Sequence, residues 1–164
     1  MTLRPQLHPF RPSDLGVIEN LWQCYQHDLS AFRGSLPDRD GRYKSSRVAA
    51  YFGSPDRAGY VIRIDDAPVG FAMIRGLVEP PRIVGEFFVV RALRRQGVGR
   101  AAATDVIRRH PGRWELAFQE ENQRASRFWR NIATGFSGSA WTVTPRARPG
   151  RPQSPPDLWL AFDA

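Results

Sequence analysis

One segment decides the fold: Glu86-Phe87-Phe88-Val89-Val90-Arg91-Ala92-Leu93-Arg94-Arg95-Gln96-Gly97-Val98-Gly99-Arg100-Ala101. Residues 86–90 are an apolar run with β-branched and aromatic side chains, which predicts a buried strand. A loop of arginine, glutamine and glycine follows, and the small residues from Ala101 begin a helix. Glycine lets a backbone turn sharply, and the N-terminus of a helix attracts anions. The segment therefore predicts a strand, a phosphate-binding loop and a helix.

The spacing of the loop excludes the two common glycine-rich nucleotide loops. It lacks the Gly-Lys-Ser/Thr ending of the nucleoside-triphosphate P-loop. A dinucleotide-binding loop needs a third glycine, where this chain has Arg100. Arg94, Gly97 and Gly99 instead fit the pattern Arg/Gln-x-x-Gly-x-Gly/Ala.

A second pattern follows a predicted strand at 113–118. It has the spacing Asn-x-x-Ala-x-x-Phe-aromatic, and its members are Asn122, Ala125, Phe128 and Trp129. The two patterns, in this order and separation, resemble the acetyl-CoA-binding segments of the GNAT superfamily of N-acyltransferases. The resemblance implies a single domain over residues 1–164 with an α+β, three-layer fold. Its sheet would be mixed and mostly antiparallel, with a splayed parallel pair of central strands, and helices would flank it.

The predicted elements agree with that architecture. The pattern of apolar residues and turn residues predicts helices at 14–28, 45–52, 98–110 and 122–132, and strands at 3–9, 60–64, 69–77, from 83, 113–118, 136–144 and 158–162. The segment 145–156 is rich in Pro, Arg and Gly, so we expect an exposed loop there.

The resemblance implies acetyl-CoA as the cofactor. Its pantetheine arm would lie along the central strand, and its pyrophosphate would meet the backbone amides of the loop. The implied cofactor-binding residues are Phe88, Val89, Val90, Arg94, Arg95, Gln96, Gly97, Val98, Gly99, Arg100, Ala101, Asn122, Phe128 and Trp129.

Acyl transfer to an amine needs a base and a group that stabilises the oxyanion. Glu86 is the candidate base, because desolvation in an apolar strand makes a carboxylate a stronger proton acceptor. Alternatively, Glu86 pairs with a neighbouring arginine or caps the strand edge, and the second choices for the base are Glu120 and Glu121. The implied oxyanion donor is the N–H of Val89.

Trp129 departs from the family, in which many enzymes carry a tyrosine at this place. Indole is not a useful acid near neutral pH, so departure of the thiolate would depend on water or on Ser126. The leading hypothesis is direct transfer of an acetyl group to the amine of a small molecule by an N-acetyltransferase. The alternatives are a catalytically silent acyl-CoA-binding or regulatory module, which Trp129 favours, and a basic nucleic-acid-binding domain.

The first helix and the loop after it would form a wall of the acceptor pocket. The candidate substrate-binding residues on this wall are Tyr25, Asp28, Phe32 and Tyr43. In this interpretation Asp28 attracts an ammonium group between aromatic sides. In the alternative interpretation the aromatic residues belong to the core and Asp28 only ends a helix.

The chain carries a net charge of +8 at pH 7, almost all of it from arginine, with Lys44 as the only lysine. Because the arginines are spread along the chain, we expect a solvated surface that attracts CoA and no nucleic-acid partner. Cys24, between Trp22 and Tyr25 on a predicted helix, is expected to be a buried structural thiol. No membrane span, signal peptide or metal site is indicated, so we expect a cytoplasmic protein. Many relatives form homodimers, and the sequence leaves the oligomeric state open.

Overall fold

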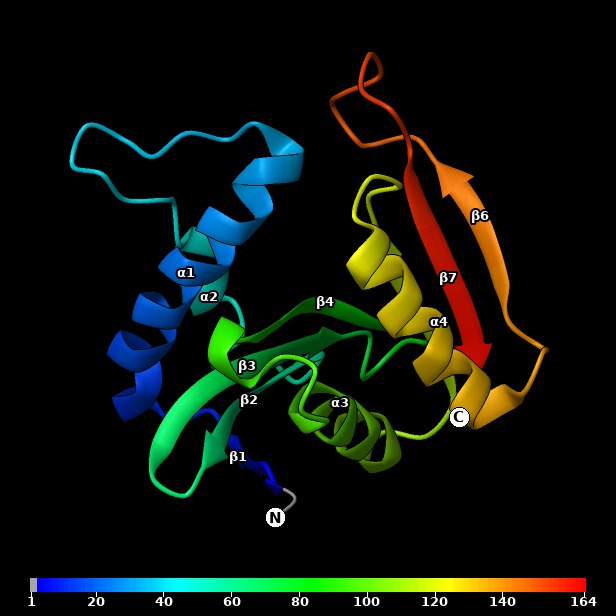
Figure 1. Cartoon of the computed structure of the whole chain (residues 1–164), viewed down its shortest axis with the longest axis horizontal. Coiled ribbons are helices and arrows are strands. Elements are labelled where there is room, and N and C mark those ends of the chain that lie inside the picture. Colours follow the sequence, from blue (N-terminus) through cyan, green and yellow to red (C-terminus); the bar gives the residue numbers. More distant parts are fainter. Residues whose placement is uncertain (1–2) are drawn as a thin grey trace.

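The computed structural model describes residues 3–164, which form one seven-stranded sheet with helices on both faces (Figure 1). The strands lie in the order β1-β2-β3-β4-β5-β7-β6, and only β4 and β5 run parallel. The elements are β1 (Gln6–Pro9), α1 (Leu15–Arg33), α2 (Ser46–Ala49), β2 (Arg57–Ile64), β3 (Ala67–Arg75), β4 (Arg82–Val89), α3 (Val98–Arg109), β5 (Arg113–Phe118), α4 (Gln123–Ser137), β6 (Thr142–Arg146) and β7 (Asp157–Asp163). Within residues 3–164, no helix is long and apolar enough to cross a membrane.

Two apolar clusters hold the helices against the sheet. On one face, Trp22 of α1 stacks on Phe71 of β3 at a ring distance of 6.1 Å, next to Val48 of α2. On the other face, α3 and α4 cover a larger cluster that includes Trp114 of β5. Trp22 and Trp114 are almost fully buried, and removing an aromatic side chain of this kind destabilises a domain by about 3–5 kcal/mol. The central strands are therefore buried on both sides, as the apolar run of β4 predicts.

The parallel strands β4 and β5 separate along their length. Only residues 82–84 of β4 pair with residues 114–116 of β5, although β4 continues to Val89 and β5 to Phe118. The register between β3 and β4 also shifts, because Met73 pairs with Glu86 whereas Ile74 pairs with Val84. Gly85 is thereby left as an extra residue that bends β4. The predicted splayed pair is confirmed.

The first helix is longer than the sequence indicates and exposes a residue expected in the core. α1 continues past Asp28 to Arg33, where Gly34 takes a left-handed conformation with φ 62° and ends it. Cys24 is exposed, so the expected buried thiol is wrong. Successive helical residues are about 100° apart, so Cys24 points about 200° away from the buried Trp22.

The C-terminal elements also differ from the prediction. The predicted strand 136–144 is wrong in its first half, because α4 continues to Ser137 and β6 begins only at Thr142. Phe136 packs on Phe162 of β7 from the last turn of α4, which explains why an apolar residue there does not indicate a strand. The expected loop is correspondingly shorter, because Pro145 and Arg146 pair with β7.

Candidate functional site

The loop between β4 and α3 presents a row of free backbone donors. Within the described residues, the N–H groups from Arg95 to Arg100 donate to no protein acceptor, and the first amide of this region that does is Ala101 N, to Gly97 O at 2.9 Å. Arg95 and Gly97 have positive φ values of 63° and 83°. Such left-handed residues, followed by the N-terminus of α3, form a concave group of N–H donors that suits an anion. The residues present therefore fit a pyrophosphate.

The end of β4 offers one N–H to the gap between the parallel strands. Val90 N donates to Val69 O of β3 at 2.8 Å. Because backbone groups alternate between the two edges of a strand, the N–H and C=O of Val89 point away from β3. The C=O of Val89 accepts a hydrogen bond from Arg94 Nε at 2.8 Å, which agrees with this orientation. Of the three strand residues predicted to contact pantetheine, Val89 thus has its N–H on the open edge.

The start of α4 faces the same region. The side chain of Asn122 caps the helix by accepting the N–H of Ala125 at 3.1 Å, which leaves its amide NH₂ without an acceptor in residues 3–164. Phe128 and Trp129 pack edge to face at 4.8 Å, and both contact Phe87 of β4. Trp129 and Ser126 are buried, so these side chains wall the gap instead of reaching into solvent.

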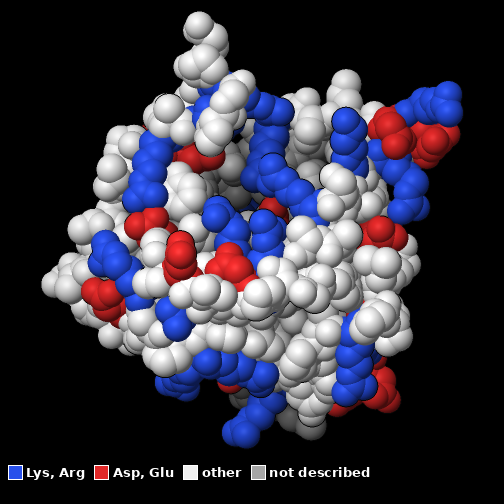
Figure 2. All heavy atoms as spheres, turned by 180° about the vertical axis from the view of Figure 1, so that it is seen from behind, with Lys and Arg blue, Asp and Glu red and all other residues white. Residues whose placement is uncertain are grey.

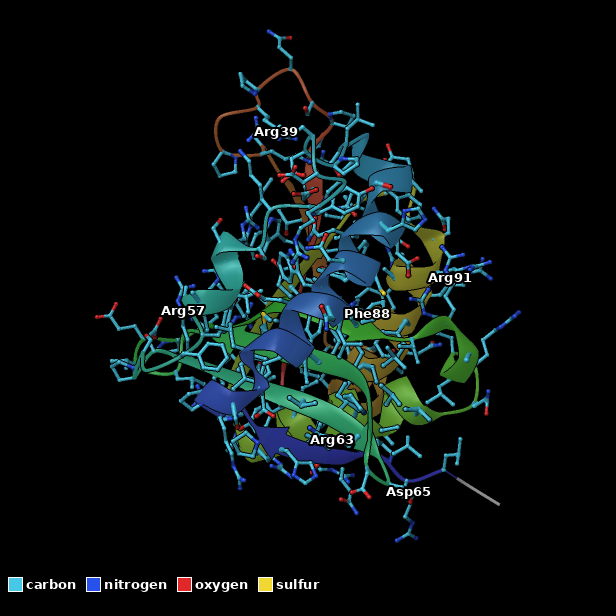
Figure 3. The ribbon with its side chains drawn as sticks, turned by 90° about the vertical axis from the view of Figure 1, so that its left-hand side faces the viewer. Arg39, Arg57, Arg63, Asp65, Phe88 and Arg91 are labelled. Atoms are coloured by element: carbon cyan, nitrogen blue, oxygen red, sulfur yellow. The ribbon has the colours of Figure 1, made fainter. Side chains whose placement is uncertain are left out.

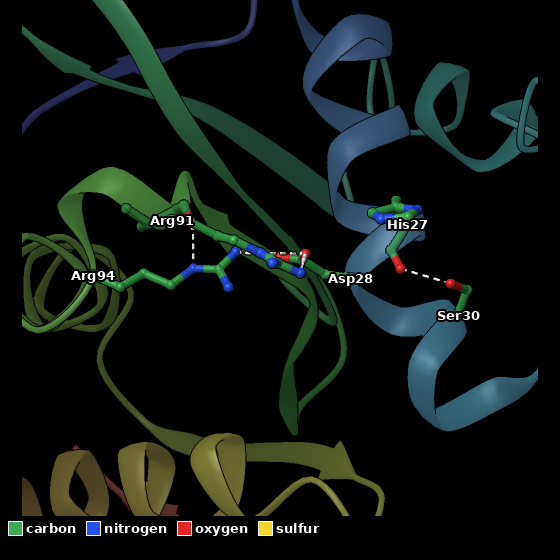
Figure 4. A network of polar contacts seen from close by, with 6 residues as sticks. His27, Asp28, Ser30, Arg91 and Arg94 are labelled. Atoms are coloured by element: carbon green, nitrogen blue, oxygen red, sulfur yellow. Dashed lines mark hydrogen bonds and ion pairs between the residues drawn. The ribbon is translucent and has the colours of Figure 1, made fainter.

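Asp28 joins α1 to the loop before α3 (Figure 4). Its carboxylate accepts hydrogen bonds from Arg91 Nε and Nη2, at 2.9 and 2.6 Å, and from Arg94 Nη2. Burial tends to raise the pKa of Asp28, but the hydrogen bonds from Arg94 and Arg91 lower it below its ordinary value. The carboxylate is therefore already paired with two guanidinium groups, which argues against the hypothesis that it attracts a substrate ammonium group.

A pocket of about 510 Å³ lies between α1, the following loop and the end of β4. Asp28 and Tyr43 line it, whereas the other two predicted wall residues, Tyr25 and Phe32, do not. Tyr43 is fixed there because its backbone exchanges two hydrogen bonds with the side chain of Gln23, at 2.7 and 2.9 Å. The pocket is also lined by residues that the sequence analysis did not place there, namely Gln23, Cys24, His27, Gly41 and Arg91. Gln23 and His27 are polar residues four positions apart on α1, so they lie on the same face of the helix. This spacing was the signal in the sequence that could have placed them together.

Glu86 is buried on the face of the sheet that α1 and α2 cover. Tyr25 donates a hydrogen bond to its Oε2 at 2.6 Å, and Arg47 Nη1 lies 3.5 Å from its Oε1. Burial and the neighbouring Glu86 charge raise the pKa of Tyr25 well above its ordinary value, so the phenol stays protonated and keeps donating. Glu86 does pair with an arginine, which is the alternative interpretation given for it in the sequence analysis. The side chain of that arginine, Arg47, is 73% exposed. An ion pair with so exposed an arginine contributes little to stability.

Comparison with known protein families gives one match. The model of the acetyltransferase (GNAT) family matches residues 19–134, which is most of the chain. The chain belongs to the GNAT acetyltransferase family. A comparison with curated proteins gave no match.

Solved structures of GNAT proteins share the fold. An acetyltransferase from Thermus thermophilus superposes with a TM-score of 0.71 at 15% identity, over 99% of both chains. The spermidine N-acetyltransferase from Vibrio cholerae, solved with CoA and spermine, has a TM-score of 0.71 at 9% identity, over 98% of this chain and 95% of that one. The ribosomal-protein-S18-alanine N-acetyltransferase from Escherichia coli has a TM-score of 0.65 at 11% identity, over 97% and 93%. Identities this low establish the fold and leave the acceptor open.

The family match and these structures confirm three predictions, namely the GNAT family, its mixed sheet between helices, and an acyltransferase as the class of enzyme. In this GNAT domain, the free amides of the loop, the open edge of β4 and the start of α4 lie around the gap between β4 and β5.

Proposed function

We propose that the protein is an acetyl-CoA-dependent N-acetyltransferase that transfers an acetyl group directly to the amine of a small molecule. The observation that carries the proposal is the row of free N–H groups from Arg95 to Arg100 beside the splayed strands β4 and β5. Acetyl-CoA, when bound, supplies an activated acetyl thioester. The Asn122 amide, the Phe128 and Trp129 rings and the backbone of β4 would hold the rest of the cofactor.

Three groups of the chain would act on the reactants. The N–H of Val89 points to the gap and would donate to the oxygen that becomes negative during transfer. Glu86 would accept the proton of the incoming ammonium through a water, because its carboxylate is shielded behind Tyr25. Tyr25 would hold Glu86 in place and remain protonated while it does so.

Trp129 stands at the position where many family members carry a tyrosine that can protonate the departing thiolate. Trp129 is 8% exposed, and its indole makes no hydrogen bond within residues 3–164. Thiolate departure would therefore depend on water or on Ser126, one turn earlier on α4. The same observation favours a second candidate function, an acyl-CoA-binding module without turnover.

A thermal-shift titration with acetyl-CoA, free CoA and a short DNA duplex tests the proposal, since a ligand that binds only the native state raises its melting temperature. We expect both CoA species to raise the melting temperature of the wild type. In Gly97→Asp, the added carboxylate lies among the donors at a backbone with φ 83°, so the rise should be lost. A screen of amines then separates the candidates, because a silent module binds CoA and acetylates none of them. A shift with DNA and none with CoA would overturn the proposal.

A further inference from the structure

Two arginines lie on the same face of the sheet as Glu86, the face that α1 and α2 cover. Arg57 of β2 and Arg75 of β3 are directly opposite in the register. Met73, two residues before Arg75, is paired with Glu86. Side chains two residues apart on a strand share a face, so Arg75 is a diagonal neighbour of Glu86.

A third arginine comes from α2. Arg47 Nη1 lies 3.5 Å from Glu86 Oε1, and the guanidinium of Arg57 lies 5.3 Å from the ring centre of Tyr51, just after α2. Asp56, which precedes Arg57, accepts hydrogen bonds from the backbone N–H groups of Gly76 and Val78. Three arginines thus lie on the face of the sheet that carries Glu86, and Arg47 is the one in contact with its carboxylate.

Arg57 and Arg75 bring two like charges together on neighbouring strands. Like charges directly opposite each other on a sheet destabilise it. In the part of the chain that the structure describes, neither guanidinium forms an ion pair. Figure 2 shows basic side chains, with acidic ones among them, around a hollow on the face of the molecule that is hidden in Figure 1. In Figure 3, Arg57 and Arg91 lie on opposite sides of Phe88, so this group is separate from the loop before α3.

We infer that the acceptor amine carries an anionic group, a carboxylate or a phosphate, that binds to Arg57 and Arg75 while the amine lies near Glu86. The inference rests on the proposed N-acetyltransferase function. Strands are about 4.8 Å apart and rise about 3.4 Å per residue, so the backbone of Arg75 lies roughly 8 Å and that of Arg57 roughly 12 Å from the backbone of Glu86. That separation suits a short amino acid or aminoalkyl phosphate, and the positive charge of the two guanidinium groups disfavours a polyamine.

The test uses acceptors that differ only in charge at the end away from the amine. They are 4-aminobutyrate, 4-aminobutanamide and 1,4-diaminobutane, with 3-aminopropylphosphonate as a second anion. Transfer is followed by loss of the thioester absorbance, because the exposed Cys24 would react with thiol reagents. A charge-assisted hydrogen bond predicts a kcat/KM at least about tenfold higher for the anionic acceptors than for the amide.

The double variant Arg57→Gln/Arg75→Gln identifies the anion site. It should raise KM for 4-aminobutyrate about tenfold or more and remove the preference for the anionic acceptors over the amide. Arg63→Gln is the matched control, because Arg63 lies on β2 as well but is paired with Asp14 at 3.7 Å. The control should keep the preference for the anion.

Equal kcat/KM values for the three four-carbon acceptors, or a preference for the diamine, would overturn the inference and leave the acetyltransferase intact. If no amine is acetylated, the proposed function fails, and calorimetric titration with 3-aminopropylphosphonate in saturating CoA decides the inference separately. Binding that weakens at least about tenfold in the double variant supports the anion site. Absence of binding, or equal binding by the double variant, refutes it.

Discussion

Glu86→Gln should remove most of the activity with little loss of stability. The Tyr25 hydroxyl, 2.6 Å from the carboxylate, can donate equally well to the amide oxygen of glutamine. Arg47 is 73% exposed, so water replaces its ion pair, and the free energy of unfolding should fall by only about 1 kcal/mol. A general base contributes about 10²–10⁴-fold to a rate. We therefore expect kcat to fall at least about a hundredfold, or about 2.7 kcal/mol of barrier.

The measurements are kcat across pH, from the thioester absorbance, and urea unfolding of the same samples. Glu115→Gln is a matched control, because Glu115 is also shielded and lies 2.7 Å from Arg146, but on β5 away from the gap. It should lose stability and keep its turnover. Unchanged turnover in Glu86→Gln would refute Glu86 as the base. A loss of turnover in Glu120→Gln, with none in Glu86→Gln, would identify Glu120, just after β5, as the base.

Three further predictions concern stability and are checked by urea denaturation. Gly97→Ala should lose about 1–2 kcal/mol because its φ is 83°, whereas Gly135→Ala, on α4 with no heavy atom within 4 Å of the added Cβ, should gain about 0.5–1 kcal/mol; equal effects would contradict the loop geometry. The pKa of Asp28 is lowered, so its ionised form stabilises the fold at neutral pH. The difference in free energy of unfolding between wild type and Asp28→Asn should therefore become smaller as pH falls below about 3.9. A difference that stays constant down to about pH 2 would contradict this role of Asp28. Burial and the charges of nearby arginines lower the pKa of His110, so the unfolded chain binds the extra proton and stability should fall as pH drops below about 6.5. His110→Gln should flatten this slope, and an unchanged slope would refute the assignment.

Elements whose signal is local were predicted well from the sequence. The strand 113–118 matches β5 at both ends, and the helix predicted to begin at 122 begins one residue later, at Gln123, with Asn122 as its cap. The helix predicted at 98–110 ends one residue earlier, at Arg109. Glycine, proline and capping residues act within a turn of where they stand, so these boundaries follow from short segments.

Pairings across the sheet could not be predicted from the sequence. Asp28 meets Arg91 and Arg94 from 63 and 66 positions away, and Tyr25 meets Glu86 from 61 positions away. Such contacts depend on how α1 lies on the sheet, which no local pattern fixes. The exposure of Cys24, by contrast, could have been predicted locally. The helical period counted from Trp22 places this thiol on the exposed side of α1.

The partners of the two carboxylates decide which kind of acceptor the site can favour. Asp28 is bound by two arginines of the loop, so an ammonium group that approaches it also meets their positive charge. Glu86 is the remaining acid, and a base that removes a proton cannot also serve as a lasting counter-ion for a second ammonium group. Arg57 and Arg75 add positive charge on the same face. A diamine therefore gains no attraction at its far end, whereas an amino acid of similar length gains two guanidinium groups.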